Sequence, residues 1–409
     1  MNSAFTELTR ALSRRRLLAA GGVGAAGVVA AACGADGSPE AATSPSSAPS
    51  VEGTTAEPSP EATMADLSDV EKIVQFSNWP QYLDEDEGDG TTMQDFIDSS
   101  GIDVIYTDDI NDSNEFYAKV RTNLEQGRSI DRDIVVLTEE GVELWIANGF
   151  AAPLDKSLIP NAKNVIPALQ DVPFDPGRQY SLPWQSGFTG IGYNTRLLER
   201  ELGVKEINSF DQFFDPRLKG RVTILVEMMD TMGPLMNWQG YDMDDFTEAQ
   251  FDDTLAVLQQ KIDEGFIRQV TGNDYIAALD SGDAIASIGW SGDVLALGRK
   301  FGFSIPESGG MIWADNMLIP SVATHKANAE RLMNYYYDPL VAARLAAWVQ
   351  YVCPVQGAQE AMADVDPDLV DDPWIFPTPE LLAQAQEFMY LGPELREQYT
   401  RRFLMAVGA

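Results

Sequence analysis

The chain has 409 residues and a formal net charge of -35, with 63 Asp and Glu against 28 Lys and Arg. A protein that binds nucleic acid needs a surface of Lys and Arg to neutralise phosphates, so this balance excludes that class of partner. An acidic cleft attracts cationic solutes. Acidic surfaces also keep exported proteins soluble, so the charge alone does not identify a ligand.

The amino terminus predicts export. Arg14 to Arg16 precede an apolar stretch, Leu17 to Ala32, that ends at Cys33. The stretch is shorter than the about 20 apolar residues of a membrane-spanning helix, so we interpret residues 1–33 as a twin-arginine-type signal. A Cys that follows small residues resembles a bacterial lipobox, which predicts lipidation of Cys33. A signal that is cleaved without lipidation is the alternative.

Residues 34–68 are rich in Pro, Ser, Ala and Glu and contain almost nothing apolar enough to bury. Such a segment cannot offset the entropy of ordering, so we predict a disordered tether. The chain has two cysteines, Cys33 and Cys353, and lipidation of the first leaves no partner for an internal disulfide. The remaining chain is long enough for a large core and two domains.

From residue 72 the chain alternates short β-branched runs with amphipathic stretches. We predict strands at 73–76, 101–106 and 133–137, and helices at 91–100 and 114–126. This alternation indicates an α/β sheet with helices on both faces. Ligands of such sheets bind at the carboxyl ends of the strands, so Asn78, Trp79, Tyr82 and Thr138 fall on the predicted binding edge.

The later part of the chain continues the mixed pattern. An apolar, Gly-containing strand is predicted at 187–194, and a strand at 284–288 leads into Trp290. A further apolar run at 317–320 follows Asp315. Helical spacing occurs at 210–214, 244–264, 328–336 and 339–348.

Aromatic and acidic residues recur together in this part of the chain: Trp290 with Asp293, Trp313 with Asp315, and Glu227 with Asp230. Indole faces and carboxylates both attract an organic ammonium ion. A lone Trp is more often a core residue, but a carboxylate beside a large apolar ring is costly to bury unless it is paired. A cationic ligand would supply the partner, so an amine is our leading hypothesis. Glu227 and Asp230 have a second interpretation, as acidic residues near a helix start.

Several segments together resemble one family, the bacterial spermidine/putrescine-binding proteins, which are receptors of ABC importers. The matching segments occur in the family's order: 78–82 (Asn-Trp-Pro-Gln-Tyr), 113–115, 133–136, 154–157, 190–194 (Gly-Ile-Gly-Tyr-Asn), 289–293 (Gly-Trp-Ser-Gly-Asp) and 319–320.

The resemblance implies a two-lobed periplasmic-binding-protein fold of type II, with a mixed sheet and flanking helices in each lobe and a ligand cleft between the lobes. It assigns residues 69–186 and 314–360 to lobe 1, and residues 187–313 and 361–409 to lobe 2. It also implies a monomeric receptor outside the cytoplasm, anchored to the cell membrane through Cys33, that uses no cofactor. The partners would be a polyamine and an ABC permease.

The resemblance further implies a set of ligand-binding residues. Trp79 and Tyr82 match an aromatic pair after the first strand, and Thr138 stands where the family commonly has Ser. The remaining positions carry stacking aromatic or acidic residues in the family: Glu227, Asp230, Trp290, Asp293, Trp313, Asp315 and Tyr351. Asp315 would be the central amine ligand, and Gln356 is a weaker polar candidate.

Other functions are open at this point. Indoles also stack on sugar rings, so a sugar receptor is the second hypothesis, and two cleft acids could act as a glycosidase pair. Adjacent tyrosines ligate iron in ferric-binding proteins, but packing at a helix end explains Tyr335 to Tyr337 better. We expect His325, the single His, to lie in a solvated loop without metal-ligand spacing. A lone His also gives no basis for a Ser-His-Asp arrangement.

Overall fold

The structure, a computed structural model, describes residues 64–84 and 91–408. The predicted signal, Cys33 and most of the predicted tether lie outside these residues. The last tether residues are packed on the folded unit, because the Leu67 amide donates to the Thr324 carbonyl at 2.7 Å and Ser68 is buried. Within the described ranges, no helix is long and apolar enough to cross a membrane.

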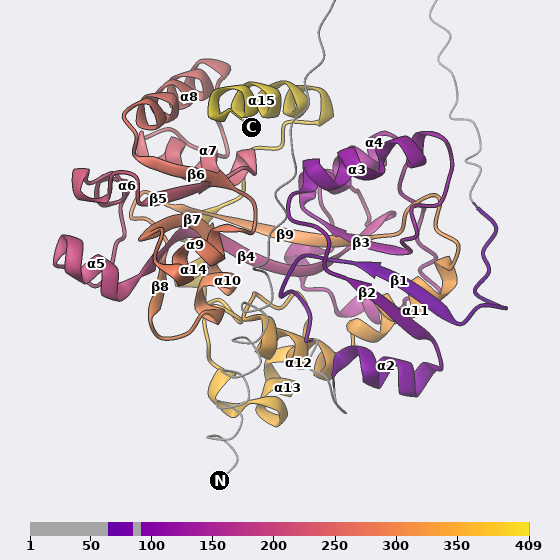
Figure 1. Cartoon of the computed structure of the whole chain (residues 1–409). Coiled ribbons are helices and arrows are strands. Elements are labelled where there is room, and N and C mark those ends of the chain that lie inside the picture. The colour runs from indigo at the N-terminus through magenta and orange to yellow at the C-terminus, as the bar shows by residue number, and fades with distance from the viewer. Residues whose placement is uncertain (1–63, 85–90, 409) are drawn as a thin grey trace, which may run out of the picture. The chain divides into compact units, whose positions relative to one another are not determined.

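A mixed sheet of ten strands runs through the described part of the chain (Figure 1). Its order is β2-β1-β3-β9-β4-β7-β5-β6, and β8 and β10 join the edges of β4 and β9. Helices cover the sheet, so the predicted α/β class is confirmed.

The first part of the sheet is parallel and follows the predicted strand–helix alternation. β1 pairs with β2 and with β3. The side chains of Thr91, Asp112 and Thr138 accept hydrogen bonds from first-turn amides, which fixes where the three helices begin. The bounds are β1 (Ile73–Ser77), α2 (Thr92–Ser100), β2 (Asp103–Thr107), α3 (Ser113–Glu125), β3 (Ile134–Leu137) and α4 (Glu139–Ala147).

Two long antiparallel strands form the centre of the sheet. β4 (Ser181–Asn194) extends several residues before the predicted start, and β9 (Gly310–Leu318) pairs with both β4 and β3. Gly187 lies opposite Trp313, and Gln185 lies opposite Asp315. Trp313 and Asp315 therefore stand within a central strand.

The remaining strands lie on the other side of β4. β7 pairs antiparallel with β4, whereas β5 and β6 continue in parallel from β7. The bounds are α5 (Thr195–Leu202), α6 (Phe210–Phe213), β5 (Val222–Leu225), α7 (Met228–Trp238), α8 (Glu248–Asp263), β6 (Ile267–Thr271), α9 (Tyr275–Ser281), β7 (Ala286–Trp290), α10 (Ser291–Ala296) and β8 (Phe301–Ser304).

The carboxyl-terminal part of the chain returns to both sides of the sheet. α11 packs near β1, while α15 lies against α7, α8 and α4, as the yellow helix in Figure 1 shows. The elements are α11 (Lys326–Tyr336), α12 (Pro339–Val349), α13 (Ala358–Val365), α14 (Pro379–Leu382), β10 (Ala385–Gln386) and α15 (Pro393–Val407). Short 3₁₀ turns occur at η1 (Pro160–Asn164), η2 (Pro167–Leu169), η3 (Pro216–Leu218) and η4 (Pro367–Leu369).

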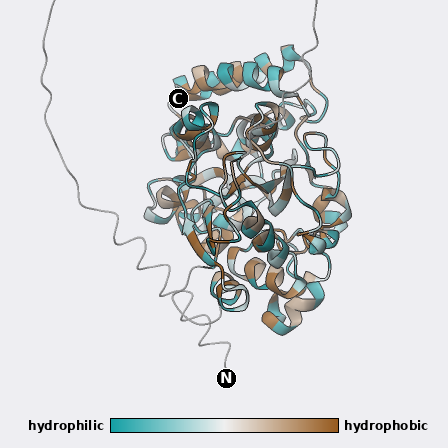
Figure 2. Cartoon of the chain, turned by 90° about the vertical axis from the view of Figure 1, so that its right-hand side faces the viewer, coloured by the Kyte–Doolittle hydropathy of each residue, from teal (hydrophilic) through white to brown (hydrophobic). Residues whose placement is uncertain are grey.

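The core consists of the apolar strands and the inner helix faces. In Figure 2, α15 at the top alternates hydrophilic and hydrophobic residues, and its inward side buries Tyr399 and Phe403. Tyr336 and Tyr337 are fully buried, and their hydroxyls donate to the carbonyls of Trp184 and Pro183. The packing interpretation of these tyrosines is therefore confirmed.

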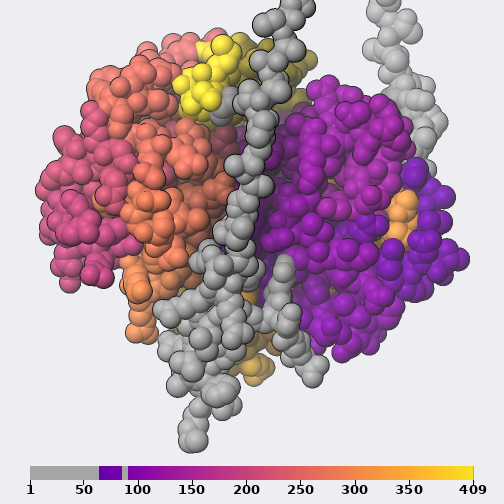
Figure 3. Space-filling view, viewed as in Figure 1, coloured from indigo at the N-terminus to yellow at the C-terminus, as the bar shows by residue number. Residues whose placement is uncertain are grey.

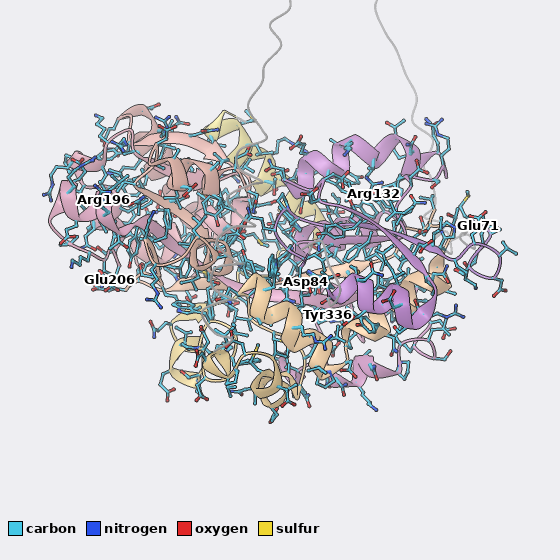
Figure 4. The ribbon with its side chains drawn as sticks, turned by 60° about the horizontal axis from the view of Figure 1, so that its bottom comes forward. Glu71, Asp84, Arg132, Arg196, Glu206 and Tyr336 are labelled. Atoms are coloured by element: carbon cyan, nitrogen blue, oxygen red, sulfur yellow. The ribbon has the colours of Figure 1, made fainter. Side chains whose placement is uncertain are left out.

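The expectation for His325 is wrong, because the side chain is 2% exposed. Its Nδ1 lies 2.9 Å from Asp133 Oδ2, and its Nε2 lies 2.9 Å from Glu71 Oε2. Glu71, labelled at the edge of the structure in Figure 4, is half exposed. Both partners are distant in sequence, so the neighbouring Lys326 misled the prediction.

Candidate functional site

All ten ligand-binding residues predicted from the sequence line one cavity. It has a volume of about 40 Å³, which is room for roughly three water molecules. The lining includes Trp79 and Tyr82 after β1, Thr138 after β3, Glu227 after β5, Asp230 in α7, Trp290 and Asp293 at the β7–α10 junction, Trp313 and Asp315 in β9, and Tyr351 after α12.

The walls of this ligand cavity come from distant parts of the chain. Figure 3 shows the purple surface of the early strands and helices on one side and the pink and orange surface of the later ones on the other. β1 and β3 contribute the ends of parallel strands to the cavity, and so do β5 and β7. The cavity therefore lies at the carboxyl edge of strands, where α/β sheets place their ligands.

The pKa of the Asp315 carboxyl is strongly raised in the ligand cavity. Asp315 is 6% exposed, and Tyr82 donates a hydrogen bond to its Oδ2 at 2.9 Å. The pKa of Asp315 is raised to about 8, chiefly by burial and also by the nearby acids Asp230, Glu139 and Asp293, while the hydrogen bond from Tyr82 opposes the rise. Trp313 precedes Asp315 by two residues, so both side chains leave the strand on the same face.

Asp293 is held by residues that the sequence analysis did not select. Its Oδ2 accepts hydrogen bonds from Asn273 Nδ2 at 2.9 Å and from the Tyr275 hydroxyl at 3.1 Å. The Tyr275 hydroxyl also accepts from the Trp290 amide at 3.0 Å, and Asn273 itself lines the cavity. Asn273 lies between β6 and α9 and Tyr275 is the first residue of α9, and nothing in this local sequence marks them.

Aromatic rings form a continuous wall. The ring centroids are 6.0 Å apart for Trp79 and Trp290, 6.4 Å for Trp290 and Trp313, and 5.7 Å for Trp313 and Tyr351. Tyr82 completes the wall at 5.0 Å from Tyr351. Neighbouring rings meet at angles of 59–76°, which are edge-to-face or tilted contacts.

The indole N–H groups of this wall are satisfied by the protein. Trp290 Nε1 donates to Asp230 Oδ1 at 2.8 Å, and Trp313 Nε1 donates to Thr189 Oγ1 at 2.9 Å. Thr189 in turn donates to Asp230. Trp79 Nε1 donates to the Val136 carbonyl at 3.1 Å. These hydrogen bonds set the orientation of the three indole rings.

Two glycines make room for the rings. A Cβ at Gly292 would lie 2.4 Å from Cδ2 of Tyr351, and a Cβ at Gly187 would lie 2.7 Å from Cζ2 of Trp313. Separations this short require one of the groups to move. Gly292, which belongs to the matching segment 289–293, and Gly187 in β4 are therefore needed for the close approach of Tyr351 and Trp313.

Glu227 and Asp230 fit both interpretations of their sequence. Glu227 precedes α7 and Asp230 lies in its first turn, yet both are buried and line the ligand cavity. Glu227 Oε1 accepts from the Ser113 amide at 3.1 Å, while its Oε2 has no donor. Burial raises the pKa of Glu227 well above its usual range and the pKa of Asp230 to about 6.

Two further carboxyls, Glu139 and Glu140, were missed. They follow Thr138 in the first turn of α4 and line the cavity, and burial raises the pKa of each to about 7. Their position directly after a predicted strand was the available signal. With them, six carboxyls face the cavity, and no Lys, Arg or His is found among the described residues that line it.

Gln356, the weaker candidate, does not line the ligand cavity. It lines a neighbouring cavity of about 570 Å³, which we call the outer cavity and which shares Glu139 and Trp313 with the ligand cavity. Gln356 Nε2 donates to the Val165 carbonyl at 3.1 Å. This hydrogen bond to a backbone carbonyl holds the Gln356 side chain away from the ring wall.

The comparisons with known proteins agree with this architecture. Residues 91–378 match the family described as bacterial extracellular solute-binding protein, which is more than half of the chain. The chain belongs to this family. It is therefore an extracytoplasmic solute-binding protein.

Individual relatives extend over most of the chain. The putrescine-binding periplasmic protein PotF of Escherichia coli is 29% identical over 357 residues, which is 82% of this chain and 91% of that protein. The spermidine/putrescine substrate-binding protein PotD of Streptococcus pneumoniae superposes with a TM-score of 0.64 at 21% identity and covers 82% of this chain and 98% of its own. The fructose-6-phosphate-bound AfuA of Actinobacillus pleuropneumoniae gives a TM-score of 0.63 at 16% identity and covers 83% and 98%. The type II periplasmic-binding fold is thus shown, whereas the fold alone does not select the ligand.

Proposed function

We propose that this protein is the receptor of an ABC importer for polyamines, with putrescine and spermidine as the leading ligands. One observation supports this most strongly: six carboxyls and a wall of aromatic rings line the ligand cavity, and none of its described lining residues is basic. Putrescine-binding PotF, 29% identical over most of this chain, supports the same ligand class.

The cavity chemistry fits an alkyl chain with ammonium groups. The ring wall formed by Trp79, Trp290, Trp313, Tyr351 and Tyr82 would contact the methylene groups. Asp315 and the other carboxyls would accept hydrogen bonds from the ammonium groups. A cation–π contact is worth roughly 0.5–2 kcal/mol and a charge-assisted hydrogen bond about 1.5–3 kcal/mol. Several together reach about micromolar affinity or tighter after the cost of association.

Two lobes would close around this ligand. The proposed lobes comprise residues 69–186 with 314–360, and residues 187–313 with 361–409. Each contributes acids and rings to the cavity: Tyr82 and Asp315 belong to the first, and Trp290 and Asp293 to the second. A ligand that contacts both lobes stabilises the closed form, because it binds that form better than the open one.

The location of the receptor completes the proposal. A lipid at Cys33 and a tether would hold the protein on the outer face of the cell membrane, where it acts as a monomer that delivers polyamine to permease subunits. The composition of residues 34–68 and the position of Cys33 after small residues support this assignment.

Sugar binding is the second hypothesis, since AfuA shares the fold. Proteins bind sugar hydroxyls with donors as well as acceptors, and the charged donors Lys, Arg and His do not occur among the described residues that line this cavity. Tyr336 and Tyr337 donate to backbone carbonyls, so they do not form a ferric site. Among the described residues, no group of three or more His, Cys, Asp or Glu could hold a metal ion.

The test is calorimetric titration of the ligand-stripped mature chain, residues 34–409, with putrescine, spermidine, spermine, maltose and ferric citrate. We expect saturable binding of at least one amine. Absence of amine binding together with binding of the sugar or of iron would refute the proposal. Incubation with oligosaccharides and an assay for new reducing ends tests the glycosidase alternative.

Replacement of Asp315 by Asn should weaken amine binding about tenfold or more, because it removes a charge-assisted acceptor. Asp244→Asn, an exposed position outside the cavity, is the matched control and should leave the affinity unchanged. Equal affinities for the two variants would show that Asp315 does not contact the ligand.

A further inference from the structure

The ligand cavity has room for roughly three water molecules, so it must widen for any amine, and a long polyamine needs further space beyond its carboxyls and rings. Its volume of about 40 Å³ contrasts with about 570 Å³ for the outer cavity. The two are separated by the side chains of Glu139 and Trp313, which line both. Any part of a ligand that passes these side chains enters the outer cavity.

The lining of the outer cavity suits a cation with an apolar body. Its charged residues are Glu139, Glu360 and Glu387, and none of the described residues that line it is basic. Apolar side chains such as Ile312 and Phe376 supply the rest of its surface. Burial is the largest cause of the raised pKa of Glu139, and the charge of Glu387 is the second. The carboxyls of the two cavities therefore interact electrostatically.

A second neighbouring cavity, of about 410 Å³, offers a different environment. It meets the ligand cavity at Glu140, but Arg396 and Arg401 line it as well. Arg396 is buried and forms an ion pair with Glu143. An ammonium group there would meet fixed positive charge. Of these two neighbours, the outer cavity is therefore the one that attracts a polyamine end.

We propose that the outer cavity is a second subsite, which holds the distal ammonium group and adjoining methylene groups of a triamine or tetraamine. This inference rests on the proposed polyamine function. A diamine is held by the carboxyls and rings of the widened ligand cavity. A longer amine passes Trp313, uses Glu139 as the carboxylate between the two cavities, and places its end near Glu360 and Glu387. The receptor then prefers long polyamines to diamines.

The test blocks the outer cavity without altering the ligand cavity. Ala168 is exposed and lines only the outer cavity of the two, so Ala168→Trp fills space there at low risk to folding. Full-length mature protein is titrated with putrescine, spermidine and spermine. We expect about a fivefold or greater loss of spermine affinity, with putrescine affinity unchanged within about twofold.

A variant that removes one charge from the outer cavity tests the second subsite independently. Glu387→Gln should weaken spermine binding by about twofold to threefold at low salt, with no effect on putrescine. Glu397→Gln, an exposed position in the cavity that contains Arg396, is the matched control and should change neither affinity. The ratio of spermine to putrescine affinity is the readout, since a general structural defect would lower both.

The outcomes separate this inference from the proposed function. If wild type binds no amine, the polyamine function itself fails. If wild type binds amines but Ala168→Trp and Glu387→Gln leave the spermine-to-putrescine ratio unchanged, the function stands and the second subsite is refuted. An equal loss for both amines in Ala168→Trp also refutes it.

Discussion

The carboxyls of the ligand cavity carry protons that a free carboxyl would lose. The pKa of Asp315 rises from an ordinary 3.8 to about 8, and those of Glu139 and Glu140 rise to about 7, in each case chiefly through burial. An ammonium ligand favours the ionised carboxylates. Binding should therefore release protons. Because the pKa values of these carboxyls are raised in the folded state, their contribution to the stability of the ligand-free protein should be greatest at low pH.

The affinity for a diamine should therefore rise with pH. Below about pH 8 the folded protein holds a proton on Asp315 that the ligand must displace. Each released proton strengthens binding by at most about tenfold per pH unit. Calorimetry at pH 6, 7 and 8, in buffers of different ionisation heat, measures both the affinity and the proton release. Asp315→Asn should flatten the profile, and a pH-independent affinity in wild type would contradict the expectation.

Among the elements, the turn from β7 into α10 sets the position of Tyr351. Gly292 in that turn leaves space for the Tyr351 ring, and a Cβ there would lie 2.4 Å from it. The ring contacts Tyr82 and Trp313 at centroid distances of 5.0 and 5.7 Å. A side chain at position 292 would thus displace the Tyr351 ring of the ring wall.

Gly292→Ala should weaken amine binding about tenfold, because the added methyl group displaces the ring. Tyr351→Ala removes the ring itself, so Gly292→Ala should cost little more in that background. A double-mutant cycle on the affinities measures this coupling. Additive losses would show that Gly292 acts through the fold and not through Tyr351.

Elements with local signals could be predicted from the sequence. β1, α2 and α3 follow hydrophobic periodicity and capping residues such as Thr91, so their observed bounds differ from the prediction by one or two residues. β5 and β6 were not predicted, because each strand is short and the polar residues Arg268 and Gln269 of β6 are exposed. Strand pairing, which identifies them, is a long-range property.

In the candidate site, too, local patterns could be predicted from the sequence and long-range contacts could not. The pairing of Trp313 with Asp315 could be predicted, but their place within β9 could not, because the apolar run identified in the sequence begins only at residue 317. The roles of Thr189, Asn273 and Tyr275 could not, since each orients a site residue from a separate segment. His325 was misplaced for the same reason, because its partners Glu71 and Asp133 are far away in sequence.

For the whole molecule, His325 joins the start of the folded unit to its sheet. Burial lowers the pKa of His325, but hydrogen bonds to Glu71 and Asp133 outweigh it and raise the pKa above 6.5. A raised pKa means that the folded state binds the proton more tightly than the unfolded state. The stabilisation is therefore complete below about pH 6.5 and is lost as the pH rises through the folded-state pKa.

His325→Ala should lower the free energy of unfolding more at pH 6 than at pH 9, by about 1 kcal/mol. The partly exposed Glu71 limits the size of this effect. Denaturant unfolding of wild type and variant at the two pH values gives the difference, with Glu71→Gln as the variant that removes one partner only. The same loss at both pH values would show that the imidazole contributes by packing alone.

The attachment of the first described residues has a mechanical consequence. Leu67 bonds to Thr324 and Glu71 to His325, so the chain enters the folded unit beside β1, β3 and α11. A load applied through the amino terminus is thus borne by that half of the sheet. The part that contains β5, β6 and β7 receives it through the pairing of β4 and β9, and through direct contacts such as the Ser113 amide with Glu227 and the Asn273 amide with the Asn111 carbonyl.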